Sequence, residues 1–340
     1  MLTIGACGYS ITGSSAIINI LKEFDEIFVI DKFEFTLAYS PDGLDDLFYH
    51  LHKYGKSTSS YIAISRFASM MEKQTRLKDL VGKNYKLIVQ KYINDITDIE
   101  WYGYCGTDNL IYPKMYQYLK KIGRLCCNIY PGNISMYLYS KLFSHPMRLS
   151  VYPEYFLEKC QELIRSLLKQ ISKETNKHIG LDQPFVGNDP KASFRYFDNP
   201  FAFVVDRDPR DLFLFVKKYL RPIGRGGQTP VDVFDFIKYY KIVRYLEHDK
   251  CDEKVIRFKL EQLIYDYDNC INQIENNLSI KNHSLRGKYF NPLTSRPNVR
   301  LFEKYRDEDS NIKIIEKELT DYLFDFDKYT DICSSGKMFL

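Results

Sequence analysis

The chain contains 340 residues, of which 45% are apolar and 27% are charged. This composition is ordinary for a globular protein, so extensive disorder is not expected, and the length suits one large domain with an insertion, or two domains. The net charge of +4 is small for this length. It argues against a dedicated duplex-binding protein, which would carry a concentrated basic patch, and we expect no nucleic-acid partner.

The cysteines and the N-terminus indicate a cellular compartment. None of the eight cysteines forms a C-x-x-C pair, so neither a zinc site nor a disulfide framework is predicted, and reduced thiols in a cytosolic protein are the simplest interpretation. Met1 leads into an apolar run without the basic region of a signal peptide, and no stretch reaches the roughly 18 apolar residues of a membrane span. We therefore expect a cytoplasmic protein, which would meet a membrane-linked substrate from the cytoplasm.

The N-terminal segment has the pattern of a strand, a glycine-bounded loop, a helix and a second strand. Residues 2–7 form a short apolar run, residues 8–13 begin and end with glycine, and apolar residues recur at helical spacing after Ser14. Residues 26–30 form a second strand, which ends at Asp31. This order favours a parallel sheet with helices on both faces.

The middle of the chain differs from its two ends. Residues 42–150 are rich in Tyr, Lys and Leu and show few strand patterns, which predicts a mostly helical insertion and a possible acceptor-binding cap. The α/β pattern then returns, so residues 1–41 and 151–340 are assigned to the nucleotide-binding core. The later elements that we predict are an amphipathic helix at 153–173, a buried strand at 201–205, a helix at 231–246, a strand at 255–260 and a helix at 265–278.

The N-terminal loop has the G-x-x-x-x-G spacing of a phosphate-binding loop, from Gly8 to Gly13. Its backbone N–H groups and the helix N-terminus would attract phosphate, and the hydroxyls of Thr12, Ser14 and Ser15 could donate to phosphate oxygens. Ser14 occupies the place of the usual lysine, which disfavours an ordinary ATPase or GTPase. A plain tight turn with a helix cap, and a dinucleotide fold with the acid that ends the second strand on the ribose, stay open as alternatives.

Two motifs make the chain resemble the nucleotide-dependent sulfotransferases. Thr12-Gly13-Ser14-Ser15 is similar to the S-G-T-T or G-G-T segment that holds the 5′-phosphosulfate of 3′-phosphoadenylyl sulfate (PAPS) in that family. The predicted strand at 203–206 runs into Arg207-Asp208-Pro209-Arg210-Asp211, which is similar to the R-[DN]-P-[RK]-D motif that grips the donor's 3′-phosphate. A weaker similarity, to a late loop that closes on the nucleotide, lies at Leu285-Arg286-Gly287-Lys288. The resemblance implies a three-layer P-loop fold with a central parallel sheet, and nucleotide binding by Gly8, Thr12, Gly13, Ser14, Ser15, Arg207, Arg286, Gly287 and Lys288.

Two positions depart from the family's pattern. Ile11 stands where the loop usually carries Lys or Arg, and Phe215 stands where a serine usually follows the first arginine of the second motif. The lost charge could be replaced by Lys32, Lys191, Arg195 or the cations of the late loop.

An acceptor hydroxyl must lose its proton as it attacks, and a positioned Glu or His is the usual base. Glycan sulfotransferases that resemble this chain place a glutamate soon after the second strand, so we assign Glu34 as the base and Lys32 as a second catalytic residue. His50 and His52 are the next candidates. The segment at 181–185 would open onto the same cleft, where Asp182 or Gln183 could touch a sugar.

The resemblance implies transfer of a sulfuryl group from PAPS to a hydroxyl of a cell-surface glycan, in polysaccharide biosynthesis and without a metal. A glycolipid acceptor would be compatible with peripheral membrane contact. A P-loop kinase or another nucleotide-dependent, glycan-modifying transferase is the first alternative, and it would need Mg²⁺ on an acidic strand end such as Asp31 or Asp206. The second alternative is a non-catalytic sulfotransferase-like binding protein, which Ile11 favours.

Overall fold

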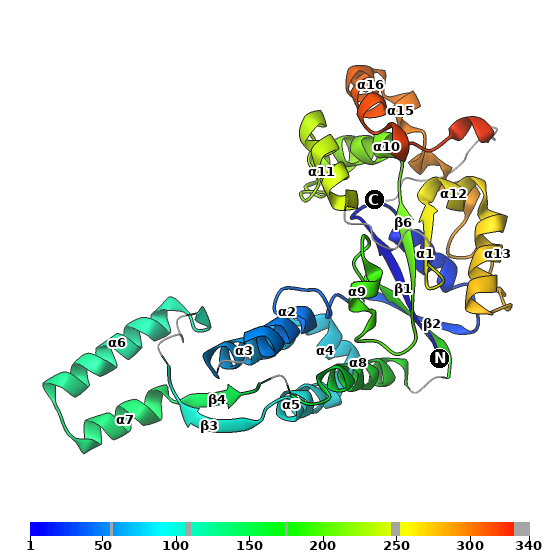
Figure 1. The fold of residues 1–340 in the computed structure, drawn as a ribbon. Helices are drawn as coiled ribbons and strands as arrows, with labels where there is room; N and C mark the ends of the chain where they lie inside the picture. Colours follow the sequence, from blue (N-terminus) through cyan, green and yellow to red (C-terminus); the bar gives the residue numbers. More distant parts are fainter. Residues whose placement is uncertain (55–56, 106–109, 152, 174–175, 246–251, 330–340) are drawn as a thin grey trace. The chain divides into compact units, whose positions relative to one another are not determined.

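A computed structural model describes residues 1–54, 57–105, 110–151, 153–173, 176–245 and 252–329 (Figure 1). The chain divides into two compact units. The first, which we call the sheet unit, comprises Met1–Thr36 and Thr175–Leu340, and the second, the helical unit, comprises Leu37–Glu174. Among the described residues, no helix is both long enough and apolar enough to cross a bilayer.

The sheet unit is built on a five-stranded sheet of order β2-β5-β1-β6-β7. Every pairing between neighbouring strands is parallel, which confirms the predicted central parallel sheet. The carboxyl ends of all five strands therefore meet at one edge, which we call the carboxyl edge, and their amino ends meet at the opposite, amino edge. The strands are β1 (Thr3–Gly8), β2 (Ile27–Glu34), β5 (His178–Asp182), β6 (Pro200–Asp206) and β7 (Val255–Lys259).

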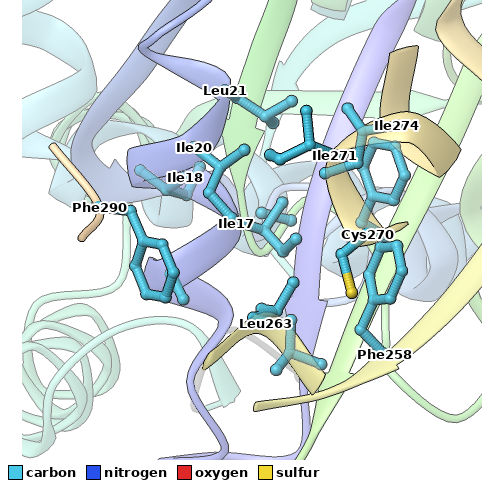
Figure 2. Packing of buried hydrophobic residues seen from close by; sticks show 14 of the residues in the cluster. Ile17, Ile18, Ile20, Leu21, Phe258, Leu263, Cys270, Ile271, Ile274 and Phe290 are labelled. Carbon is cyan, nitrogen blue, oxygen red and sulfur yellow. The ribbon is translucent and has the colours of Figure 1, made fainter. Parts of the chain in front are cut away.

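Alternation along β1 directs its side chains to two different layers. Ile4 and Ala6 join a buried apolar cluster with residues of α1 (Ser14–Leu21), α12 (Leu260–Tyr265) and α13 (Tyr267–Leu278), which cover one face (Figure 2). On the other face, a side chain at Gly5 would collide with the Phe185 ring, 2.5 Å from the added Cβ. The segment that carries α9 (Pro190–Phe194) packs there through aromatic contacts between Phe185 and Phe194. Helical segments thus flank the sheet, as the α/β prediction required.

A second apolar cluster lies among the helices that follow β6, and its core includes Phe213, Phe236 and Ile315. Its helical segments are α10 (Pro209–Leu214), a π-helical continuation at Phe215–Leu220, α11 (Val233–Tyr245), α15 (Leu301–Lys304) and α16 (Asp309–Glu318). A further short helix of the sheet unit is α14 (Pro292–Ser295).

The helical unit differs from the predicted insertion in two respects. It contains a two-stranded antiparallel sheet, β3 (Ile99–Gly103) with β4 (His145–Leu149), which has little apolar alternation to reveal it. It also includes α8 (Phe156–Ser172), which we had assigned to the core, because α8 packs on α5 and places Cys160 Sγ 3.2 Å from the Tyr92 hydroxyl. The other helices are α2 (Leu44–Tyr49) with a π-helical turn at His50–Tyr54, α3 (Ser57–Lys73), α4 (Thr75–Val81), α5 (Tyr85–Asp95), α6 (Lys114–Ile129) and α7 (Asn133–Phe143).

Candidate nucleotide site

The loop between β1 and α1 is held in place by the Thr12 side chain. Its hydroxyl donates to the Val205 carbonyl oxygen at 2.6 Å and accepts from the Tyr9 N–H at 3.0 Å. Gly8 makes this possible, because a Cβ there would lie only 2.6 Å from Thr12 Oγ1. This corrects the expectation for Thr12: its proton is committed to the neighbouring strand, so the side chain fixes the loop instead of donating to a ligand.

The N-terminus of α1 has no side-chain cap. The residue before it is Gly13, whose φ of 103° lies in the left-handed region that glycine tolerates. The first N–H groups of a helix have no partner within the helix, and the helix dipole favours an anion beside them. Gln183 supports this corner: its side chain accepts from the Gly8 N–H at 3.3 Å and donates to Ser14 Oγ at 2.9 Å, which leaves the Ser14 proton available to a ligand.

A cavity of about 570 Å³ opens at this helix end, a size typical of small-molecule sites. Ser14, Ser15 and Asn19 line it from α1. The opposite wall consists of residues after β6 and of the first residue of α12, namely Arg207, Phe215, Leu220, Arg225, Gly226 and Leu260. The structure thus brings the two sequence motifs, Thr12–Ser15 and Arg207–Asp211, to one place at the carboxyl edge.

Arg207 is the most unusual residue of this wall, because its side chain is large, charged and only 2% exposed. Its Nη2 donates to the Asn298 carbonyl oxygen, and its guanidinium lies 4.5 Å from the centre of the Phe215 ring. Nε is buried and has no hydrogen-bond partner among the described residues. Phe215 therefore supports the guanidinium by stacking, and Arg207 retains a donor that no described residue uses.

The carboxyl groups around Arg207 do not neutralise it through direct contact. Asp211 accepts from the N–H groups of Arg300 and Leu301, both at 2.7 Å, and Glu261 accepts from the Asp208 N–H at 3.0 Å. Burial raises the pKa of both Asp211 and Glu261 above the ordinary value of a carboxyl group. Burial lowers the pKa of Arg207, while these neighbouring carboxyl groups raise it. A buried positive charge with an unused donor is costly unless an anion completes it.

The two acidic strand ends that could have held Mg²⁺ are engaged elsewhere. Burial alone would raise the pKa of Asp206, but Lys259, at 2.9 Å, and Arg244 hold it well below the ordinary value. Asp31 forms an ion pair with Lys22. These ion pairs leave the kinase alternative without an available carboxylate at the two positions on which it depended.

Glu34 and Lys32 lie on β2, an edge strand two positions away from β1, and neither lines the cavity. Neighbouring strands are about 4.8 Å apart, so the end of β2 lies roughly 10 Å from the end of β1. Asp182 pairs with Glu34 in the register of β5 and β2 and with Ala6 in that of β5 and β1. Burial, and then the charges of Glu34 and Asp31, raise the pKa of Asp182 to about 6, which is suitable for a general base near neutral pH.

The late loop is not brought to the cavity, and this corrects its assignment to the nucleotide. The Gly287 N–H donates to the carboxylate of Glu23 at 3.1 Å, and Arg286 pairs with Asp268. Glu23 follows the C-terminus of α1, at the amino edge of the sheet. The contact between Gly287 and Glu23 therefore holds the late loop, with Arg286 and Lys288 on either side of it, at the end of α1 opposite the cavity.

The other candidate residues are dispersed. His50 and His52 belong to the helical unit, where His50 lines a small cavity of about 180 Å³ and His52 stacks on Phe48. Lys191 pairs with Asp252. The sequence prediction missed Arg225, an exposed residue that lines the cavity and makes no ion pair with any described residue. Its signal was the basic, glycine-rich run Gly224-Arg225-Gly226-Gly227.

No known protein family and no curated protein matches the sequence. Two solved structures are similar at low level. Sulfotransferase STF9 from Mycobacterium avium is 11% identical over 98% of this chain and 78% of its own, with a TM-score of 0.35. Retinol dehydratase in complex with androsterone and the inactive cofactor PAP is 14% identical over 95% of this chain and 81% of its own, also with a TM-score of 0.35. At this TM-score neither likeness supports transfer of residues or roles.

Proposed function

We propose that this protein is a sulfotransferase that uses PAPS as its sulfuryl donor. The observation that carries the proposal is the buried Arg207, which lines a cavity at the uncapped N-terminus of α1 and whose Nε has no hydrogen-bond partner among the described residues. A nucleotide with phosphates at two positions would satisfy both features, because helix N-termini and guanidinium groups are the main anion-binding elements of proteins.

The residues divide into two groups for such a ligand. Gly13, Ser14 and Ser15 would hold the 5′ end of the donor through backbone N–H groups and hydroxyls, and Gly8 gives the loop its shape. Arg207 would bind the 3′-phosphate. Arg225 supplies a second cation at the cavity and is our candidate for the charge that Ile11 lacks, while a role for Lys32 stays a prediction. When bound, the donor supplies the sulfuryl group, and the protein orients it and withdraws the acceptor's proton.

Two carboxylates are candidates for the general base that removes the proton of the acceptor hydroxyl. Glu34, our first choice, lies at the end of an edge strand and is exposed to solvent. Asp182 lies one strand nearer to the loop and has the raised pKa. Gln183, the residue after Asp182, donates to Ser14 Oγ on the cavity wall at 2.9 Å, so an acceptor hydroxyl held by either carboxylate could approach the donor from this side. Replacement of each carboxylate separately by its amide distinguishes the two.

The acceptor that we propose is a hydroxyl of a cell-surface glycan or glycolipid, modified in the cytoplasm. The likeness to glycan sulfotransferases around Glu34 supports this choice of acceptor. An acceptor-binding role for the helical unit stays a prediction. Contact with a membrane surface is independent of the sulfuryl-transfer proposal.

The decisive experiment is a calorimetric titration of the full chain with adenosine 3′,5′-bisphosphate, with ATP and Mg²⁺ as the control ligand. We expect the bisphosphate to bind and the Arg225→Ala variant to bind roughly five- to tenfold more weakly. Arg286→Ala is the matched control, because it removes an exposed arginine from the amino edge, and it should bind like the wild type. Binding of ATP with Mg²⁺ but not of the bisphosphate would overturn the proposal in favour of a kinase.

The non-catalytic alternative predicts the same binding but no turnover. Incubation with PAPS and a panel of cytoplasmic glycan precursors tests it, with release of adenosine 3′,5′-bisphosphate as the readout. Acceptor-dependent release would exclude the alternative. If the nucleotide binds but no acceptor in the panel stimulates release, the enzyme assignment fails for the acceptor class that we propose.

A further inference from the structure

The segment that carries α6 and α7 has an unusual charge pattern. Between residues 110 and 151 the sequence contains no Asp or Glu. Its basic residues are Lys114, Lys120, Lys121, Arg124, Lys141 and Arg148. Arg148 lies on β4 and pairs with Glu100 of β3 at 2.9 Å. The hairpin of α6 and α7 contains no carboxylate to compensate the other five basic residues, so it favours a negatively charged partner.

The two helices pack against each other through only one face of each. On α6 this face contains Gly123, where an added Cβ would lie 2.7 Å from the Phe143 ring of α7. The Tyr116 hydroxyl on the same face donates to the Phe143 carbonyl oxygen at 3.1 Å, and Arg124 Nε donates to the Tyr139 hydroxyl at 3.1 Å. Figure 1 shows α6 and α7 as neighbours that run in opposite directions.

The most apolar face of each helix is turned away from this contact. On α6, large apolar side chains recur at the three- and four-residue spacing of one helix face, and each is more than half exposed: Met115, Tyr118, Leu119, Ile122, Leu125 and Ile129. On α7 the same is true of Ile134, Leu138 and Leu142. A helix pair that packs through aromatic and polar side chains and leaves its aliphatic stripes exposed is the reverse of the ordinary pattern in a globular domain.

Both stripes lie on the same side of the hairpin. At about 100° per residue, each stripe is rotated in the same sense from the face that packs on the other helix. Because the two helices are antiparallel, equal rotations bring the stripes to one common surface, which we call the hairpin face. Lys114 and Lys121 border the stripe of α6, where their long side chains can extend past it to a polar layer.

We propose that the hairpin face docks onto an anionic lipid bilayer. α6 is about 24 Å long at 1.5 Å per residue, which is shorter than the hydrocarbon core of about 30 Å. The helix pair is therefore suited to lie in the membrane interface and not to span the bilayer. Apolar stripes bordered by lysines are the pattern of interfacial helices, and anionic lipids match the uncompensated charge. A second copy of the chain is a poorer partner, because two basic faces would repel each other.

Vesicle sedimentation with the full chain tests this proposal, without donor or acceptor, so its result does not depend on the sulfotransferase assignment. Vesicles of phosphatidylcholine alone are compared with vesicles that also contain phosphatidylserine. The double variant Leu119→Glu, Leu138→Glu changes only exposed residues of the hairpin face and should lower partitioning at least tenfold. Leu87→Glu, on an exposed position of α5 in the same unit, is the matched control and should partition like the wild type.

Removal of charge tests the lipid specificity. Lys114→Gln and Lys121→Gln should each lower partitioning into phosphatidylserine vesicles by about fivefold, corresponding to about 1 kcal/mol per charge, and leave the weak binding to phosphatidylcholine unchanged. Absence of wild-type binding to phosphatidylserine vesicles would overturn the proposal, as would an equal loss in Leu87→Glu. A wild-type dimer in sedimentation equilibrium that the double variant converts to monomer, with vesicle binding unaltered, would assign the face to a second copy instead.

Discussion

The two edges of the central sheet each bury a charged side chain, and they treat it in opposite ways. At the amino edge, the fully buried Glu23 carboxylate accepts from the N–H groups of Tyr289 and Phe290 at 2.7 and 2.8 Å, and from Gly287. His283 Nε2 lies 2.8 Å from its second oxygen. At the carboxyl edge, the buried Arg207 has a backbone carbonyl, an aromatic ring and an unused Nε.

This difference separates a structural charge from one that points to a ligand. Glu23 is completed by the chain itself, so it organises the loop at 283–290 and has no capacity left for a substrate. Arg207 has an Nε without a partner among the residues that the structure describes, although burial of an incompletely paired charge costs several kcal/mol. The carboxyl edge is therefore the edge at which a ligand would lower the free energy of the folded protein.

The largest effect should come from replacement of the proposed base at the carboxyl edge. Glu34→Gln keeps the size of the side chain but removes the proton acceptor, so turnover should fall by about 10²–10⁴ while the affinity for the donor product is unchanged. Single-turnover kinetics and calorimetry on the same preparation separate these two quantities. Asp25→Asn, the matching change at an exposed site near the amino edge, should retain wild-type turnover; if both variants lose it equally, the distinction between the edges collapses.

Replacement of the buried charge at the amino edge should lower the stability of the protein and leave nucleotide binding unchanged. Glu23→Gln replaces an acceptor-only carboxylate by an amide that cannot satisfy the same N–H groups, so the free energy of unfolding should fall by about 3 kcal/mol. Urea denaturation followed by circular dichroism measures this loss. At low urea, where the variant is folded, adenosine 3′,5′-bisphosphate should bind as it does to the wild type. Impaired binding there would show that the late loop reaches the nucleotide after all.

Arg207 should behave in the opposite way. Arg207→Ala should weaken binding of adenosine 3′,5′-bisphosphate by roughly 1.5–3 kcal/mol, as expected for a charge-assisted hydrogen bond. Arg207→Lys keeps the charge but loses the planar guanidinium, with its several N–H donors and its stacking on Phe215. Its affinity for the bisphosphate should therefore lie between those of the wild type and Arg207→Ala. Because the residue is buried, thermal melts of both variants are needed beside the titrations. A large loss of stability with unchanged affinity would make Arg207 a structural residue like Glu23.

The sequence predicted the parts of this site that depend on local pattern. Strand β1, the glycine loop and α1 follow from an apolar run, glycine spacing and helical periodicity, all of which act within a few residues. The strand that ends before Arg207 was equally clear, as its apolar run is continuous. The sequence did not predict that these two segments are neighbours in the sheet, because the order of strands is set by tertiary contacts; the structure shows it by pairing β1 with β6.

The errors concern features that only tertiary contacts decide. The amphipathic pattern of α8 correctly predicted a helix, but periodicity does not reveal which unit covers its apolar face. The late loop at 285–288 is basic and rich in turn residues, which says nothing about the edge of the sheet on which it lies; the buried Glu23 decides that. Arg225 was missed because a lone arginine in a glycine-rich turn is ordinary until a cavity is found beside it.

The smallest expected effect concerns Asp182, and its sign is fixed by the raised pKa of about 6. An acid whose pKa is higher in the folded protein than its ordinary value near 4 binds more protons when folded. The stability that it contributes is therefore complete below about pH 4 and is lost as the pH rises through about 6.

Asp182→Asn should remove this dependence, so that at pH 7.5 the variant is more stable than the wild type by about 1 kcal/mol, a figure reduced to allow for solvent screening of a partly exposed group. Thermal melts of the wild type and the variant at pH 4.5 and 7.5 measure this difference in stability. If the variant loses as much stability between the two pH values as the wild type does, the raised pKa belongs to another group. The same variant also decides between the two candidate bases. If Asp182 is the base, wild-type kcat/KM should rise with pH around 6 and the variant should lose turnover as Glu34→Gln was expected to do. If Glu34 is the base, Asp182→Asn removes a neighbouring negative charge and should change turnover only a fewfold.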